Sequence, residues 1–146
     1  MSDRKDLHDR FAQSLVFASR RWRNLMNQEL GRVGQSQARW VTLYWIAVFG
    51  ESVNQTELAG RIGVEQQTLG RVLRDLEREG LIERVASKDD KRAKVLRLTH
   101  AADPVMQQIT SIQAALRQKL LSGIEPQDLE TCTAVFAAIL ANSEGA

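Results

Sequence analysis

The stretch from residue 54 to residue 98 constrains the fold most, because its hydrophobic spacing changes from a helical period to a strand period within one short segment. Asn54, with Glu57 three residues later, resembles a capping box that starts a short helix, and Gly63 ends it. A second helix is predicted from about residue 65 to residue 79. Because so few residues separate the two helices, the segment predicts a helix-turn-helix unit. Its shared core is expected to consist of Leu58, Ile62, Val64, Leu69 and Val72.

A hairpin is predicted directly after these helices. Two short β-compatible runs, at residues 81–85 and 95–98, flank a polar loop from Ser87 to Arg92. The order of elements, four helices, a hairpin and two helices, lacks the βαβ alternation of a parallel sheet. The predicted fold class is therefore mainly α with a small β-hairpin wing: a winged helix-turn-helix lobe plus a helical lobe.

Helical spacing also dominates the two ends of the chain. A long amphipathic helix is expected from residue 7 to about residue 30, and Ser36 is placed to cap a second helix that runs to Gly50. Helical spacing returns after the hairpin, where Pro104 either starts or kinks the fifth helix. Pro126 is expected at the first position of the sixth helix.

The apolar stripes of the terminal helices are longer than the central lobe could cover. We expect them to pair across a two-fold axis, the alternative being a monomeric bundle. This interpretation makes residues 1–146 one domain, with dimerisation helices at 7–34 and 100–143. The winged helix-turn-helix lobe then spans 36–99, with its recognition helix at about 65–79 and its wing at about 81–98.

Composition narrows the class of protein. With 43% hydrophobic and 26% charged residues the chain is ordinarily globular, and no apolar run is long enough to span a membrane. Its charged start has no apolar leader, and the single cysteine, Cys132, cannot form an intrachain disulfide. We therefore expect a cytoplasmic, nucleoid-associated protein, with Cys132 buried in the stripe between Leu129 and Phe136.

The inventory of reactive side chains argues against an enzyme. His8 and His100 are the only histidines, and neither has the spacing of a metal ligand. No serine or cysteine has a base near it in sequence. We expect no catalytic residue, no metal and no cofactor.

The basic residues lie where a polyanion could meet them. Residues 61–97 contain ten Lys or Arg against seven Asp or Glu, whereas residues 98–146 contain two against five. In the helix at 65–79 an apolar stripe turns inward, which leaves the opposite face to polar side chains, namely Gln67, Arg71, Arg74 and Arg78.

These polar side chains suit DNA recognition. Gln and Arg pair bidentately with adenine and guanine edges in the major groove, and Gln67 and Arg71 lie nearest the helix start. Arg74 is better placed for phosphates. Arg78 either does the same or pairs with Asp75 on a solvated face. Two explanations fit the mid-helix Gly70, namely close approach of a DNA backbone or tight helix packing.

The tip of the hairpin is a second predicted DNA-binding element. An arginine on a wing can enter the negative minor groove, and a neighbouring aspartate can hold its guanidinium extended. Asp90 and Arg92 have this arrangement in the sequence.

Several runs of the chain together resemble the winged helix of the MarR family of bacterial regulators, and its SlyA branch most closely. They are 63–69 (GVEQQTL), 75–82 (DLEREGLI), 90–94 (DKRAK) leading to Leu98 and Thr99, and 40–43 (WVTL). The resemblance covers nearly the whole chain. It implies an obligate homodimer on a palindromic double-stranded DNA site, with Arg71 in the major groove and Asp90 bracing Arg92 in the minor groove.

The resemblance also extends the set of expected binding residues. The expected DNA-binding set is Gln66, Gln67, Thr68, Arg71, Arg74, Lys88, Asp90 and Arg92. A small aromatic carboxylate or phenolic ligand, held between the dimer helices and the reading lobe, would contact Arg20, Ser36, Trp40 and Tyr44. For this second set the alternative is that the aromatic pair is plain core and Arg20 anchors a dimer salt bridge.

Two other functions share parts of this pattern. An architectural protein that displaces other DNA coaters without sensing a ligand would have the same DNA-facing residues, so only a ligand response separates it from a regulator. A winged helix reused for protein contacts should instead present apolar side chains on the helix at 65–79.

Overall fold

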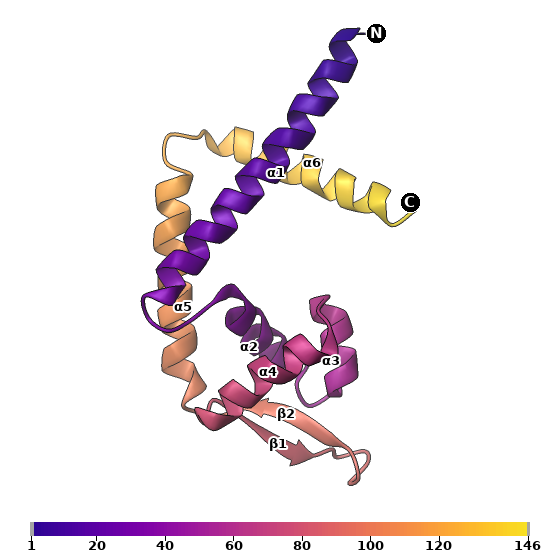
Figure 1. Ribbon diagram of the computed structural model, residues 1–146, viewed down its shortest axis with the longest axis vertical. Coiled ribbons are helices and arrows are strands. Elements are labelled where there is room, and N and C mark those ends of the chain that lie inside the picture. Colours follow the sequence, from indigo (N-terminus) through magenta and orange to yellow (C-terminus); the bar gives the residue numbers. More distant parts are fainter. Residues whose placement is uncertain (1, 146) are drawn as a thin grey trace. The chain divides into compact units, whose positions relative to one another are not determined.

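The computed structural model describes residues 2–145 and forms six helices and one antiparallel hairpin within them (Figure 1). The elements are α1 (Ser2–Gly31), α2 (Gln37–Phe49), α3 (Gln55–Ile62), α4 (Gln66–Arg78), β1 (Ile82–Ala86), β2 (Lys94–Leu98), α5 (Ala102–Leu120) and α6 (Pro126–Ser143). The predicted fold class, mainly α with a small hairpin, is confirmed. The chain divides into two compact units, residues 1–113 and 114–146.

The helices of the central lobe begin and end at the predicted caps. The Ser36 hydroxyl accepts a hydrogen bond from the Arg39 amide at 3.2 Å, and Asn54 Oδ1 accepts from the Glu57 amide at 2.8 Å. Gly63 ends α3 in the left-handed conformation, with φ +79°, which other residues adopt only at a cost. These local signals set where α2 and α3 start and where α3 ends.

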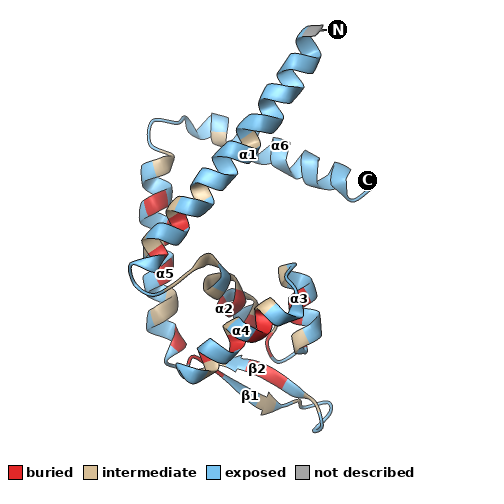
Figure 2. Cartoon of the chain, viewed as in Figure 1, coloured by how far each residue is buried: buried red, intermediate tan, exposed pale blue. Residues whose placement is uncertain are grey.

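The ribbon of α4 carries several buried positions (Figure 2), and leucines are the largest side chains in the core of this lobe. Leu58 of α3 and Leu69, Leu73 and Leu76 of α4 are almost completely buried, together with Leu43 of α2. The same stripe that fills the core turns the polar face of α4 outward.

Two residues expected in this core do not belong to it fully. Val64 is 38% exposed, because it lies in the turn that leaves the left-handed Gly63 rather than at the helix crossing. Val72 is half-buried. The expectation that Val64 supplies core was wrong.

The hairpin pairs Ile82 with Leu98 at its base and Ala86 with Lys94 near its tip. Its base is joined to the end of α4, since the Leu81 amide donates to the Leu76 carbonyl at 2.9 Å. The C-terminal end of α2 also packs closely on β2: a Cβ added at Gly50 would clash with the Leu96 carbonyl oxygen. The wing is therefore held against two helices at its base.

The ends of the chain expose apolar side chains. In α1, Met26 and Leu30 are buried, whereas Phe11 and Phe17 nearer its start are 43% and 64% exposed. α5 begins at Ala102, so Pro104 lies in its first turn and starts the helix rather than kinking it.

The last helix, α6, has Pro126 at its start, as predicted, and no residue from Pro126 to Ser143 is buried. Cys132 is exposed, so the burial expected for it is not provided by a single chain. Within residues 2–145 no helix is both long and apolar enough to cross a membrane.

Candidate nucleic-acid interface

The outer face of α4 forms a concave surface with the first residue of α3. It is lined by Gln55, Gln66, Gln67, Gly70, Arg71 and Arg74, and its volume is about 640 Å³. None of these lining residues is acidic. The surface therefore combines amide donors with two guanidinium groups, the chemistry that binds phosphates and the edges of purines.

The side chains on this face stand in two rows along the helix. Gln66, Gly70 and Arg74 follow one another at intervals of four residues, and a Cβ built at Gly70 would lie 3.5 Å from Arg74 Nη1 and 3.7 Å from Gln55 Nε2. This row faces α3. Gln67 and Arg71 form the neighbouring row, and both are exposed.

The other residues of α4 that were expected to contact DNA differ in how far they are exposed. Thr68 is half-buried, while Gln66 and Arg74 are exposed and line the concave surface. Arg78 pairs with Asp75 at 3.3 Å across one turn of the helix, which fits the solvated-face interpretation.

A chain of polar contacts joins α4, β1 and α3 beside the concave surface. Arg84 Nε donates to Glu77 Oε1 at 2.7 Å, and Arg84 Nη1 donates to Gln55 Oε1 at 3.2 Å. Sequence reasoning missed Gln55, because the contact that orients it spans 29 positions of the chain and has no local signature.

The tip of the wing is organised by Asp90. Its Oδ1 accepts a hydrogen bond from the Arg92 amide at 3.0 Å, and its carbonyl accepts from the Ala93 amide at 3.0 Å. Among the described residues Asp90 makes this bond to the backbone of Arg92 and no ion pair with its guanidinium. The bracing of the Arg92 guanidinium in a minor groove stays a prediction. Asp90 shapes the turn that carries Arg92, and both residues are exposed.

Farther along the wing, Arg97 Nη2 contacts Glu83 Oε1 on the neighbouring strand at 2.6 Å. The hydrogen bond to Glu83, together with the negative charge of that carboxylate, raises the pKa of Arg97 above its ordinary value. Arg97 is therefore a charged cross-strand partner of Glu83.

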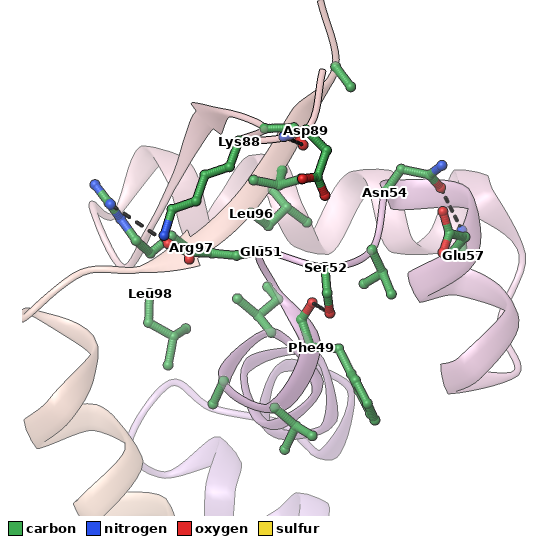
Figure 3. Close-up of a pocket in the computed structure, with 17 residues that line it drawn as sticks. Phe49, Glu51, Ser52, Asn54, Glu57, Lys88, Asp89, Leu96, Arg97 and Leu98 are labelled. Carbon is green, nitrogen blue, oxygen red and sulfur yellow. Dashed lines mark hydrogen bonds and ion pairs between the residues drawn. The ribbon is translucent and has the colours of Figure 1, made fainter. Parts of the chain in front are cut away.

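A second hollow of about 750 Å³ lies between the end of α2, the segment after it and the wing (Figure 3). Its wall carries charges of both signs, Glu51, Glu57 and Asp89 beside Lys88 and Arg97. Lys88, expected to contact DNA, lies on this wall. The mixture of charges does not select one class of ligand.

The four residues expected around a ligand are only partly assembled. The rings of Trp40 and Tyr44 lie 5.8 Å apart at 40°, and Tyr44 is 46% exposed. The Ser36 hydroxyl already caps α2, and Arg20 is exposed on α1. None of these four residues lines either of the hollows described above.

The residues described by the structure contain no group of three or more His, Cys, Asp or Glu side chains that could hold a metal ion.

Comparison with known proteins gives the family. Residues 36–94 match the family model described as MarR family. Over 93% of this chain and 99% of the other, the fold superposes on the crystal structure of the transcriptional regulator PA3341, with 40% sequence identity and a TM-score of 0.79. The chain belongs to the MarR family. It is thus a member of a family of DNA-binding, winged-helix transcriptional regulators.

More distant MarR-like folds are similar in structure. The S. aureus MepR–DNA complex matches 90% of this chain and 95% of its own at 22% identity, with a TM-score of 0.74. CouR from Rhodococcus jostii RHA1, bound to p-coumaroyl-CoA, matches 91% of this chain and 93% of its own at 20% identity, with a TM-score of 0.75.

Proposed function

We propose that this MarR-family regulator binds a pseudo-palindromic double-stranded DNA site as a homodimer, with α4 in the major groove and the wing in the minor groove. The observation that carries the proposal is the concave face of α4, which presents amides and guanidinium groups and no acidic side chain. A winged helix reused for protein contacts would present apolar side chains on this face of α4, and the residues that line it include none.

The two rows on α4 suggest a division of labour. Gln67 and Arg71, in the outward row near the helix start, are placed to read base edges. Gln66 and Arg74 are placed for the backbone, with Thr68 at the margin. In the wing, Asp90 shapes the turn that presents Arg92 to the minor groove, and Lys88 adds charge nearby.

Unpartnered apolar side chains support the homodimer. The early part of α1 exposes Leu7, Phe11, Val16 and Phe17, and α6 exposes Val135, Phe136, Ile139 and Leu140. Exposed apolar stripes of this length are typical of interfaces. We therefore assign residues 7–34 and 100–143 to dimerisation, 36–99 to DNA binding, and Cys132 to the surface that a second copy covers.

We also propose that a small aromatic carboxylate or phenol modulates DNA binding at Arg20, Ser36, Trp40 and Tyr44. The exposed Tyr44 beside Trp40 could hold an aromatic ring, and Arg20 could pair with a carboxylate. CouR, a protein of the same fold, has been seen with p-coumaroyl-CoA bound. If no ligand changes its DNA binding, the protein would instead be the architectural alternative, which has the same DNA-facing residues.

Selection of binding sites from a pool of randomised duplexes tests the proposal, with light scattering on the free protein. The expected results are a motif with two-fold symmetry, half-site centres about 10 bp apart, and a particle of two chains. A stable monomer at micromolar concentration, or a motif without symmetry, would contradict it.

A further inference from the structure

We propose that a pair of glutamine side chains, Gln37 of α2 and Gln113 of α5, fixes the angle between these two helices and thereby the half-site spacing that the dimer accepts. The inference rests on the proposed homodimer on a two-fold symmetric site, and it adds the residues that set the geometry of that dimer. Neither glutamine belongs to the residues assigned above to DNA or to a ligand.

The first observation is a single polar side chain on the buried stripe of α5. The buried residues of this helix are Ala102, Ile109, Gln113 and Leu116, and all but Gln113 are apolar. Gln113 is only 7% exposed. A buried amide needs a hydrogen-bond partner, whereas an apolar side chain does not. One polar residue on an otherwise apolar helix face is a means of fixing register and orientation at a cost in stability.

The second observation is the partner of Gln113, which is the first residue of α2. Gln113 Nε2 donates to Gln37 Oε1 at 3.3 Å, across 76 positions of the chain. Within residues 2–145 this is the one side-chain hydrogen bond that joins α5 to another helix. A hydrogen bond is directional, unlike the burial of Ile109 and Leu116. It therefore favours one rotation and one sliding position of α5 against α2.

Gln37 is itself held from a third helix. As the first residue of α2, it has a backbone amide without an acceptor inside the helix. Asn27 Oδ1, on α1, accepts a hydrogen bond from this amide at 3.0 Å. The start of α2 is therefore bonded to α1 through the backbone of Gln37 and to α5 through its side chain.

The same turn of α2 is also bonded to the recognition helix. Arg39, two residues after Gln37, forms an ion pair with Glu79 at the C-terminal end of α4. A change in the angle between α5 and α2 therefore changes the direction of α4 relative to α5. Since we assign α5 to dimerisation and α4 to the major groove, two-fold symmetry applies this angle twice. It then sets the separation of the two copies of α4.

The test uses Gln37→Leu, Gln113→Leu and the double variant, with Gln107→Leu as the matched control. Gln107 is on the same helix but is exposed. Affinity is measured for the selected site and for sites with one base pair added or removed between the half-sites, which moves one half-site by about 3.4 Å and about 34°. The native protein and the control should lose about tenfold for either change. The other three variants should lose only about threefold.

Stability separates this positioning role from a merely structural one. The double variant should unfold at the native temperature or above it, because two apolar side chains replace two hydrogen-bonded amides. Gln37→Leu should be less stable than the double variant, since it leaves the buried amide of Gln113 without its partner. Both single variants should nevertheless weaken the spacing preference as much as the double variant does, because each removes the same bond. Gln113→Met, which is unbranched, repeats the test should leucine not pack.

Three results would overturn the inference. They are a folded double variant that discriminates between spacings as sharply as the native protein, a loss of affinity by the same factor at every spacing, and additive effects of the two single variants on the spacing preference. A native protein that binds no duplex, or that binds every spacing alike, would contradict the proposed function itself. Sharp native discrimination that survives in the double variant contradicts only this inference.

Discussion

Arg39, in the first turn of α2, forms an ion pair with Glu79, which caps the C-terminal end of α4. The Arg39 side chain is only 14% exposed, and its Nε also donates to Gln35 Oε1 at 2.9 Å. The contact ties the helix that carries Trp40 to the helix that we propose reads DNA. It is a direct polar link between these two helices.

Replacing Arg39 with methionine should lower the free energy of unfolding by about 1–2 kcal/mol, because the charge-assisted hydrogen bonds are lost while much of the apolar contact is kept. Glu79→Gln should cost less, since Glu79 is half exposed and an amide can still accept the hydrogen bond. Urea denaturation measures both. Equal stability of Arg39→Met and the native protein would show that the pair has no structural role.

The Arg71→Ala and Arg92→Ala variants should lose DNA affinity in different ways. Arg71→Ala should cost roughly 1–3 kcal/mol on the selected site and relax the preference at one base pair. Arg92→Ala should weaken binding to all duplexes and reduce the salt dependence of log K by about one unit. Titrations at several salt concentrations separate the two. Identical losses on specific and random DNA would contradict the assignment of reader and positioner.

Two variants of Asp90 test whether the wing depends on the hydrogen bond from the Arg92 amide or on the negative charge of Asp90. Asp90→Asn keeps Oδ1 as the acceptor for the Arg92 amide and removes a negative charge near DNA, so it should bind at least as tightly as the native protein. Asp90→Ala loses the acceptor, and its looser turn should weaken binding. If both variants bind equally, the charge of Asp90 rather than its hydrogen bond is what matters.

The elements themselves could be predicted because their signals are local. Ser36 and Asn54 bond to amides three residues away, and Gly63 is required by the backbone of its own turn. Such patterns are visible in a few letters of sequence.

Contacts between distant segments could not be predicted in this way. The bond from Arg84 to Gln55 and the close approach of Leu96 to Gly50 depend on how the hairpin packs against the helices. For the same reason Val64 was assigned to the core, although it is exposed in the turn beside Gly63. The alternation of apolar and polar residues indicates which face is buried but not which partners meet on the other.

A small aromatic carboxylate such as salicylate should bind near Arg20, Trp40 and Tyr44 and weaken DNA affinity by about 5- to 150-fold at saturation, the usual scale of coupling between sites. Tryptophan fluorescence measures the affinity with and without operator DNA, and Trp40→Phe identifies the signal that comes from this site. Tyr44→Ala should remove the binding. Equal ligand affinity in both states would mean a passive site and favour the architectural alternative.

The spacing of the half-sites tests the central claim most directly. Two copies of α4 on one face of a duplex require half-site centres about one helical turn apart, so inserting 5 bp between them turns one half-site to the opposite face. Affinity for the selected pseudo-palindrome and for this insertion should be measured at the same salt concentration. The account predicts that the insertion lowers affinity nearly to the level of random duplex. Affinity unchanged by the insertion would contradict a dimer that reads both half-sites at once.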